Sequence, residues 1–261
     1  MPETDVHKRG DLRGRESDVR SIRTNPYLDG KKVGLIIPSV NTTTEPEFAW
    51  LAPPQISFHA ARVFMNVTSP EALREMNAEV YHAARLLATL SPHALAYVCT
   101  AGSFVDGSQG TRALLDDLGS VVDCPVVATS AVLIEALRHL DITRLGLATP
   151  YPEDVTEAER RFLMNSGIDV VSCECLGRSG AEVRRTTFDE ILALVRAVDK
   201  PVAQAIFISC TDLRATEMIG HLEREFHKPI LTSNLVTLWG ILGALGFADP
   251  LVSLGQLVRG P

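Results

Sequence analysis

The chain has 261 residues, of which 46% are hydrophobic and 22% charged, and its formal net charge is -7. These totals are typical of a globular protein of one large domain or two smaller ones. The acidic balance argues against nucleic acid as the main partner, because a phosphate backbone selects basic surfaces. No apolar run approaches the roughly 18–20 residues that a membrane span requires.

The chain begins without a recognisable signal peptide, so we expect a cytoplasmic protein with no membrane partner. Five cysteines stand at irregular spacings, and only Cys173 and Cys175 are close together. Their C-x-C spacing matches neither a C-x-x-C redox pair nor half of a usual zinc site. No two of the seven histidines have the spacing of a metal pair. We therefore expect free thiols in a reducing compartment and no metal.

Residues 1–30 are polar and dense in both charge signs, which predicts a flexible N-terminal extension. From Lys32 onward, short apolar runs alternate with amphipathic stretches. The expected strands cover residues 33–37, 56–65, 94–99, 125–129, 144–149, 169–176, 205–210 and 229–233. The expected helices cover residues 69–90, 110–119, 130–140, 152–167, 188–198, 214–226 and 234–245. This alternation predicts an α/β fold of parallel sheets with helices on both faces.

Three segments of the first half recur in the same order in the second half. The related pairs are 33–48 with 145–162, 94–102 with 205–213, and 124–140 with 228–245. Chance similarity between generic α/β units is the alternative explanation. The order of the pairs instead favours two similar three-layer αβα halves related by a pseudo-twofold axis. We assign residues 31–143 with 234–261 to the first α/β domain, and residues 144–233 to the second.

Two of the apolar runs end in the dipeptide Cys-Thr, at Cys99 and at Cys210. Ligands of open α/β sheets bind outside the carboxyl ends of strands, so related halves would present both thiols to one cleft. A thiolate is a strong nucleophile and a competent proton acceptor. A single buried cysteine is usually only a small hydrophobe, as we expect for Cys124 and Cys173. The matched pair favours catalysis by Cys99 and Cys210.

Other groups at the strand ends suit a carboxylate ligand. Asn41 either caps the helix that follows it or binds the ligand. Tyr151 either packs over the turn at Pro152 or directs its hydroxyl to the ligand. Backbone N–H groups after each cysteine can hold a carboxylate. The predicted substrate-binding residues are Ser39, Asn41, Thr100, Ala101, Tyr151, Thr211 and Asp212. No G-x-G-x-x-G or Walker A motif follows an expected strand, so we predict no nucleotide cofactor.

Six motifs resemble the aspartate/glutamate racemase superfamily, in its branch of maleate cis-trans isomerases and arylmalonate decarboxylases. They are GLIIPSVNTTTEPE (34–47), SPEALREMN (69–77), YVCTAGSF (97–104), LATPYPEDV (147–155), ISCTDL (208–213) and PILTSN (229–234). The resemblance covers the chain from about Lys32 to its C-terminus. It implies two domains of one fold, with a site between them that uses neither a cofactor nor a metal.

The resemblance also implies roles for individual residues. Cys99 matches the nucleophile of the isomerases, and Cys210 matches their second, proton-handling cysteine. Asn41 and Tyr151 match ligands of the substrate carboxylates. The decarboxylase relatives carry glycine in place of the first cysteine, so Cys99 favours isomerase or racemase chemistry. Maleate isomerases carry a second substrate-binding asparagine where this chain has Gly180, which is closer to the decarboxylase pattern.

These observations predict a cofactor-independent cis-trans isomerase of a small dicarboxylate, with maleate to fumarate as the leading case. The alternatives are an amino-acid or hydantoin-type racemase, an arylmalonate-type decarboxylase, a small-acid binding module, and a redox switch between the two cysteines. The apolar stretch NLVTLWGILGALGF (234–247) is typical of a covered helix or an interface, so we also expect a homo-oligomer.

Overall fold

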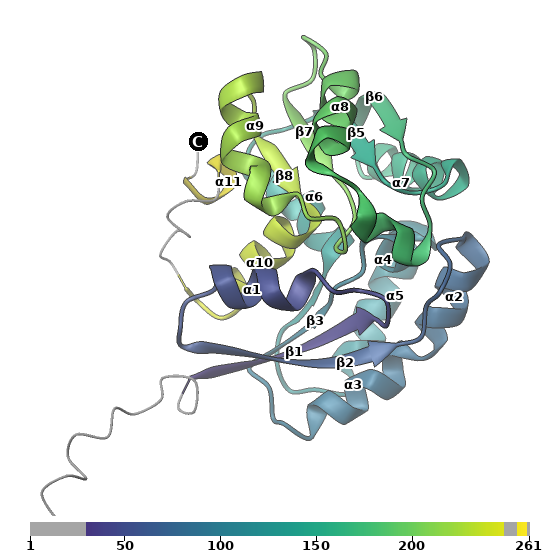
Figure 1. Ribbon diagram of the computed structural model, residues 1–261. Coiled ribbons are helices and arrows are strands. Elements are labelled where there is room, and N and C mark those ends of the chain that lie inside the picture. Colours follow the sequence, from purple (N-terminus) through teal and green to yellow (C-terminus); the bar gives the residue numbers. More distant parts are fainter. Residues whose placement is uncertain (1–29, 248–254, 260–261) are drawn as a thin grey trace, which may run out of the picture.

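The computed structural model describes residues 30–247 and 255–259 (Figure 1). The predicted extension, residues 1–30, therefore lies outside the described residues except for Gly30. The first half contains β1 (Lys31–Pro38), α1 (Thr44–Leu51), β2 (Ile56–Val63), α2 (Pro70–Ala78), α3 (Val80–Ala88), β3 (Ala94–Tyr97), α4 (Thr100–Phe104), α5 (Gly107–Gly119), β4 (Val126–Ala128) and α6 (Thr129–His139).

The second half repeats the alternation of strands and helices. It contains β5 (Arg144–Thr149), α7 (Glu153–Asn165), β6 (Asp169–Cys175), the 3-10 helix η3 (Gly180–Arg185), α8 (Phe188–Val198), β7 (Ala205–Ile208), the 3-10 helix η4 (Thr216–Met218), α9 (Ile219–Phe226), β8 (Ile230–Thr232) and α10 (Ser233–Ala244). A short helix, α11 (Gln256–Arg259), follows the second gap in the described residues.

The strands form two four-stranded sheets with the same internal order. The first is β2-β1-β3-β4 and the second is β6-β5-β7-β8, and all pairings are parallel. Each strand of the first sheet therefore has a counterpart in the second. This repeated order confirms the predicted α/β class with two similar parallel-sheet halves.

The inner strands are continuous apolar runs because helices cover both of their faces. Val33, Leu35, Ile36 and Ile37 of β1 are fully buried, as is all of β3. Strands buried on both sides need no alternation of polar and apolar residues. The outer strands β2 and β6 are more exposed, as expected for strands at a sheet edge. The inner strands therefore hold the core of each half, and their carboxyl ends are held rigidly.

The expected helix over residues 69–90 is divided in the structure into α2 and α3. The Glu79 N–H bonds the carbonyl of Met76, three residues back, so the helix tightens to a single 3-10-like turn there. Just before this turn, the Asn77 side chain bonds the Gly102 carbonyl at 2.8 Å. The division therefore lies where α2 is tied to α4.

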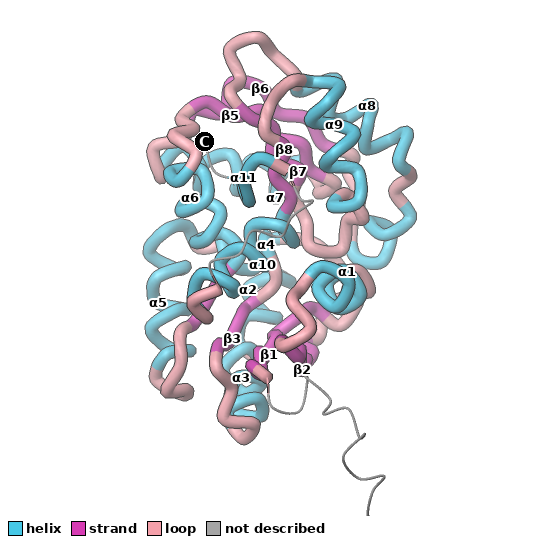
Figure 2. The backbone as a smooth tube through the Cα atoms, turned by 90° about the vertical axis from the view of Figure 1, so that its left-hand side faces the viewer, coloured by secondary structure: helices cyan, strands magenta, loops and turns pink. Residues whose placement is uncertain are grey.

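Helix α10 packs mainly against elements of the first half, namely α6, β4, β3 and α1, and also against β8. Figure 2 shows α4 and α10 between the strands of the two sheets. The assignment of residues 234–261 to the first domain stays a prediction, with which this packing agrees. The apolar surface that indicated a covered helix or an interface is thus covered within one chain. No helix in the described ranges is both long enough and apolar enough to cross a membrane.

Helices α6 and α10 follow the equivalent strands β4 and β8 and pack closely on each other. The hydroxyls of Thr129 and Thr237 lie 2.9 Å apart between them. Gly240 faces Val132, and a Cβ atom at Gly240 would lie 2.5 Å from the Val132 Cγ1. A glycine is required here because a branched side chain in a helix has little freedom to move aside. This contact sets the distance between the two helices.

We expect Gly240→Ala to lower the free energy of unfolding by about 1–3 kcal/mol, because the added methyl overpacks this contact. Gly243→Ala is the matched control on the same helix, since nothing lies within 4 Å of its Cβ position. Alanine there is expected to be neutral or to stabilise by up to ~1 kcal/mol through helix propensity. Urea denaturation of both variants measures the difference. Equal stabilities would contradict the close contact between α6 and α10.

Candidate active site

A pocket lies where the carboxyl ends of the two sheets meet. Asn41 and Cys99 follow β1 and β3, and Tyr151 and Cys210 follow the equivalent strands β5 and β7. The complete lining is Pro38, Val40, Asn41, Met65, Thr68, Leu73, Cys99, Thr100, Ala101, Tyr151, Gly180, Val183, Cys210, Thr211 and Asp212. Equivalent strand ends thus bring the two Cys-Thr dipeptides to one cavity.

Cys99 is buried and begins helix α4 as its N-cap. Its sulfur accepts a hydrogen bond from the Gly102 N–H at 3.3 Å, and a further one from the Ala101 N–H. Burial raises the pKa of the Cys99 thiol to about 11, although these N–H groups and the Tyr97 hydroxyl oppose the rise. Loss of hydration outweighs the hydrogen bonds, so the thiol is protonated at neutral pH before substrate arrives.

Sequence reasoning missed the Tyr97 hydroxyl, which forms a hydrogen bond with the Cys99 thiol. The run ALAYVC could have indicated this contact, because Tyr97 and Cys99 are two residues apart and such residues face the same side of a strand. The Tyr97 hydroxyl also donates to the Asn77 Oδ1 at 2.6 Å. Each of the two cysteines therefore has one tyrosine hydroxyl beside its sulfur.

Cys210 has a φ of 90°, in the left-handed region that non-glycine residues rarely adopt. The Asp212 N–H approaches its sulfur at 3.4 Å, and the Tyr151 hydroxyl forms a hydrogen bond with it. Burial and the Asp212 carboxyl raise the pKa of the Cys210 thiol far above its usual range, and negative charge on Cys99 raises it further. Strained backbone of this kind is often found at functional sites.

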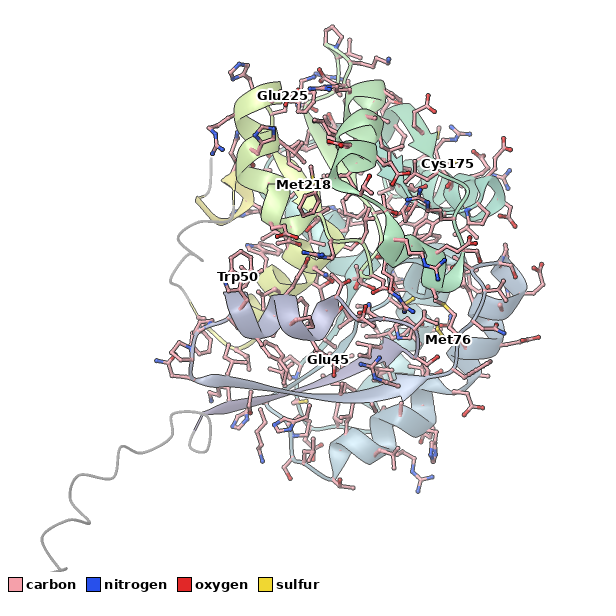
Figure 3. The ribbon with its side chains drawn as sticks, in the orientation of Figure 1. Glu45, Trp50, Met76, Cys175, Met218 and Glu225 are labelled. Carbon is pink, nitrogen blue, oxygen red and sulfur yellow. The ribbon has the colours of Figure 1, made fainter. Side chains whose placement is uncertain are left out.

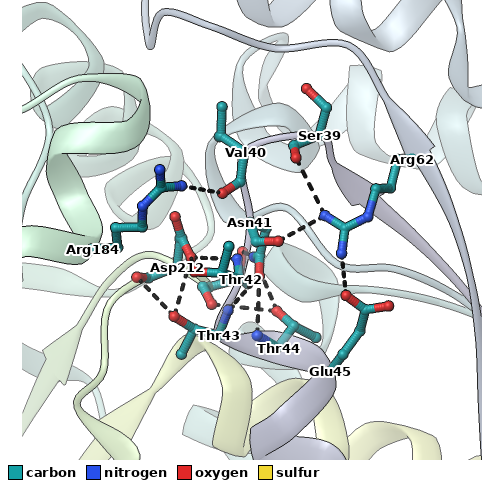
Figure 4. Close-up of polar contacts among 11 residues, drawn as sticks. Ser39, Val40, Asn41, Thr42, Thr43, Thr44, Glu45, Arg62, Arg184 and Asp212 are labelled. Atoms are coloured by element: carbon teal, nitrogen blue, oxygen red, sulfur yellow. Dashed lines mark hydrogen bonds and ion pairs between the residues drawn. The ribbon is translucent and has the colours of Figure 1, made fainter.

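The Asn41 amide uses all of its hydrogen-bonding groups in this structure (Figure 4). Its Oδ1 accepts from the N–H groups of Thr43 and Thr44, each at 3.0 Å. Its Nδ2 donates to the hydroxyls of Thr44 and Thr211, also at 3.0 Å. Asn41 therefore organises the start of α1 and ties the first half to Thr211 of the second. Its binding of a ligand stays a prediction that requires the Nδ2 to exchange a partner.

The Asp212 carboxyl is buried and bonded on one side only. Its Oδ1 accepts from the Thr42 N–H at 2.8 Å and from the Thr43 hydroxyl at 3.1 Å, whereas its Oδ2 has no partner among the described residues. Burial raises the pKa of this carboxyl against the opposing effects of these hydrogen bonds and the Arg184 charge. Arg184 itself donates to the Val40 carbonyl at 3.0 Å. The neutral acid is favoured more than in an exposed aspartate.

Ser39 does not line the pocket, although it was predicted to bind substrate. Its hydroxyl donates to the Met65 carbonyl at 3.1 Å and accepts from the Met65 N–H at 3.0 Å. Ser39 thus fixes the loop after β2. The hydroxyls of Thr100 and Thr211 bond Ser233 at 2.8 Å and the Val98 carbonyl at 3.3 Å. Both threonines line the pocket while their hydroxyls make contacts within the protein.

Gly180 has a φ of 52°, and a Cβ atom there would lie 2.1 Å from the Asn66 carbonyl oxygen. Its N–H donates to the Thr68 hydroxyl at 3.1 Å, and the Thr68 N–H donates to the Ser179 hydroxyl at 2.6 Å. The loop after β2 and the start of η3 thus close together over the pocket. The backbone of Asn66 therefore leaves no room for a side chain at position 180.

The remaining cysteines lie away from this pocket. Cys173 and Cys175 are on the edge strand β6 and line a separate surface hollow; Figure 3 shows Cys175 near the rim of the molecule. Cys124 is half-buried and is likewise not among the lining residues. Within the described ranges, no three His, Cys, Asp or Glu side chains are arranged to hold a metal ion.

No lining residue of the pocket is Lys, Arg or His. A bound anion would therefore meet backbone N–H groups, hydroxyls, thiols and the carboxyl of Asp212, but no basic side chain of the lining. Two thiols that line one small pocket suit chemistry at a single carbon skeleton, with one sulfur as nucleophile and the other as proton donor or acceptor.

The family model of arylmalonate decarboxylase matches residues 33–258 of the chain. A maleate isomerase of Nocardia farcinica is 28% identical over 240 residues, covering 88% of this chain and 96% of that protein. An arylmalonate decarboxylase of Bordetella bronchiseptica is 26% identical over 217 residues, covering 82% and 90%. The resemblance predicted from the six motifs is thus confirmed.

A solved structure extends this similarity to three dimensions. It is a cysteine-to-serine mutant of the Nocardia farcinica maleate cis-trans isomerase with a covalently bound succinylcysteine intermediate. It matches with a TM-score of 0.82 and 26% identity, covering 88% of this chain and 98% of that one. Because the family model spans nearly all of the described residues and the fold agrees, the chain belongs to the arylmalonate decarboxylase family.

Proposed function

We propose that the protein is a cofactor-independent cis-trans isomerase of a small dicarboxylate, of the maleate-to-fumarate type. The observation that carries this proposal is the presence of Cys99 and Cys210 on one pocket, each with a backbone N–H and a tyrosine hydroxyl at its sulfur. Similarity to maleate isomerases along nearly the whole chain supports it. Five free cysteines accord with work in the reducing cytoplasm.

Cys99 first loses its thiol proton to solvent, because its raised pKa keeps it protonated at rest. As the thiolate, it then adds to one alkene carbon of the bound dicarboxylate and forms a carbon–sulfur bond. The π electron pair moves toward the carboxylate on the other carbon, and the Cys210 thiol supplies a proton to that carbon. The resulting thioether rotates about its carbon–carbon single bond. The Cys210 thiolate then takes a proton back, the double bond reforms as trans, and Cys99 leaves as the thiolate. Protons and electrons balance without a further reactant.

The pocket would hold the substrate carboxylates through neutral donors. Backbone N–H groups after each cysteine point into the same region as the sulfurs. A bound dianion would raise the pKa of Asp212 further through like-charge repulsion, which favours its neutral form. The neutral acid can donate a hydrogen bond through the unpartnered Oδ2. Asp212 is thereby compatible with an anionic ligand.

An arylmalonate-type decarboxylase is the second candidate, and Gly180 is the residue that favours it. Against it stands Cys99, where the decarboxylase relatives carry glycine. A decarboxylation needs only one proton donor at the carbon, whereas the isomerisation uses both sulfurs. The complete pair therefore favours the isomerase.

Cys99→Ser is expected to lower kcat on maleate roughly 10⁴-fold or more, as when a covalent nucleophile is removed. Cys210→Ser is expected to cost about 10²–10⁴-fold and to accumulate an adduct of one maleate on Cys99. Proton NMR follows maleate and fumarate, and intact mass spectrometry detects the adduct. Cys124→Ser, away from the pocket, serves as the control and should retain wild-type turnover. Full activity of either serine variant would refute the assignment.

Alkylation of Cys99 by iodoacetamide should quicken about tenfold per pH unit between pH 7 and 9.5. The reason is that only the thiolate reacts, and its fraction keeps rising until the pH reaches the raised pKa of about 11. Peptide mass spectrometry of samples quenched at intervals gives the rate at Cys99 alone. A plateau below pH 9 would show a thiol that is less desolvated than this pocket implies.

Gly180→Asn is expected to raise KM for maleate and lower the melting temperature, because its Cβ would overlap the Asn66 carbonyl and open the closed loops. Gly177→Asn is the matched control, since Gly177 also has a positive φ, 68°, but nothing lies within 4 Å of its Cβ position. Steady-state kinetics and thermal melts compare the two. A gain in kcat/KM for Gly180→Asn would mean that the missing amide limits the natural enzyme.

A further inference from the structure

Glu159 of α7 is fully buried in the second half and is not among the lining residues of the pocket. Its Oε1 accepts a hydrogen bond from the Ser209 hydroxyl at 2.8 Å. Its Oε2 has no partner among the described residues. A buried carboxyl with one empty oxygen is costly to keep and calls for an explanation beyond packing.

Ser209 connects Glu159 to the site. It is fully buried, immediately precedes Cys210, and its Oγ lies 3.4 Å from the Tyr151 hydroxyl. Tyr151 in turn forms a hydrogen bond with the Cys210 thiol. A continuous row of groups therefore runs from Glu159 through Ser209 and Tyr151 to the sulfur of Cys210. We call this row the hydroxyl chain.

No basic group acts on the pKa of Glu159, so its protonation is determined mainly by burial. Tyr151 after β5 and Cys173 on β6 are the titratable groups that its charge affects, and neither of them is basic. Arg160, its neighbour on α7, is paired with Glu157. Burial raises the pKa of Glu159 to about 8, with Ser209 alone opposing the rise. Both forms of the carboxyl are thus accessible near neutral pH.

The protonation of Glu159 determines which way the hydroxyl chain donates. When Glu159 is neutral, its O–H can donate to Ser209, Ser209 to Tyr151, and Tyr151 to the sulfur. When Glu159 is charged, Ser209 must donate to the carboxylate, and Tyr151 turns its hydrogen toward Ser209. Each hydroxyl has only one hydrogen to give. The Cys210 sulfur then loses its tyrosine donor and faces an additional buried negative charge.

The row of hydrogen bonds beside the Cys99 thiol contains no carboxyl group that could change the direction in which it donates. The Tyr97 hydroxyl beside Cys99 donates to the amide of Asn77, whose Nδ2 donates to the Gly102 carbonyl. An amide does not titrate, so the direction of that row is independent of pH. Of the two tyrosine rows, the one that leads to Cys210 ends in a group that can change its charge.

We propose that Glu159 is a positioning residue that sets the direction of the hydroxyl chain and so controls whether Cys210 receives a hydrogen bond from Tyr151. The role of Cys210 in turnover rests on the proposed function, whereas the control of its thiol does not. When Glu159 is neutral, Tyr151 donates to the Cys210 sulfur and stabilises its thiolate. When Glu159 is ionised, this hydrogen bond is lost and the protonated Cys210 thiol is favoured.

The test measures the reactivity of Cys210 toward iodoacetamide from pH 6.5 to 9.5 in Cys99→Ser protein, by peptide mass spectrometry. We expect the rate to rise about tenfold per pH unit at first and to flatten above pH 8, as Glu159 ionises and suppresses the thiolate. Adding Glu159→Gln, which keeps the shape but cannot ionise, should restore the steady rise. Glu153→Gln, an exposed change on the same helix, should leave the flattening in place.

Ser209→Ala provides a second variant, because it interrupts the hydroxyl chain without touching the carboxyl. It should weaken the flattening and slow alkylation below pH 8, and circular dichroism reports whether each variant is folded. Identical profiles for the Glu159→Gln protein and its Cys99→Ser parent, or a parent with no flattening, would overturn the proposal.

Maleate turnover in the Glu159→Gln single variant separates this proposal from the proposed function. With wild-type cysteines, kcat/KM should bend above pH 8 in the natural protein and lose that bend in the variant, with little change at pH 7. No turnover by the natural protein would defeat the isomerase assignment and leave the alkylation result to decide on Glu159.

Discussion

The central constraint of this structure is that two thiols share one small pocket in which burial desolvates both of them. Desolvation disfavours a sulfur anion there, and negative charge on Cys99 raises the pKa of the Cys210 thiol further. One thiolate and one thiol is therefore the highest state of ionisation that the pocket readily supports. Backbone N–H groups beside each sulfur make that single charge more tolerable. A mechanism with one nucleophile and one proton carrier is the chemistry that this constraint permits.

The fold that brings the sulfurs together could be predicted largely from the sequence. Apolar runs such as ALAYVC and AIFISC indicate inner strands because burial on both faces leaves no room for polar alternation. The matching Cys-Thr dipeptides indicated one shared site, since equivalent strand ends meet in a repeated fold. The division of the 69–90 helix was not predicted; it lies beside the contact of Asn77 with Gly102, a residue 25 positions away.

The details of the site were less predictable because they rest on contacts between distant residues. Asn41 bonds Thr211, 170 positions away, and Glu159 bonds Ser209, 50 positions away, so no local pattern announces either pair. Ser39 stands beside Asn41 in the sequence, yet its hydroxyl is taken by the Met65 backbone. The sequence was sufficient to predict where the strands end. It was not sufficient to predict the hydrogen-bond partners of the side chains at those ends.

A pocket lined without Lys, Arg or His has a consequence for how its ligand is chosen. Dipoles of N–H and O–H groups act only over short distances, so they attract little from bulk solvent, and the overall charge of -7 gives a dianion no guidance toward the protein. Recognition then depends on how well the spacing between acceptor oxygens fits fixed donors. Affinity set in this way varies little with ionic strength, and it separates geometric isomers better than it separates anions from one another.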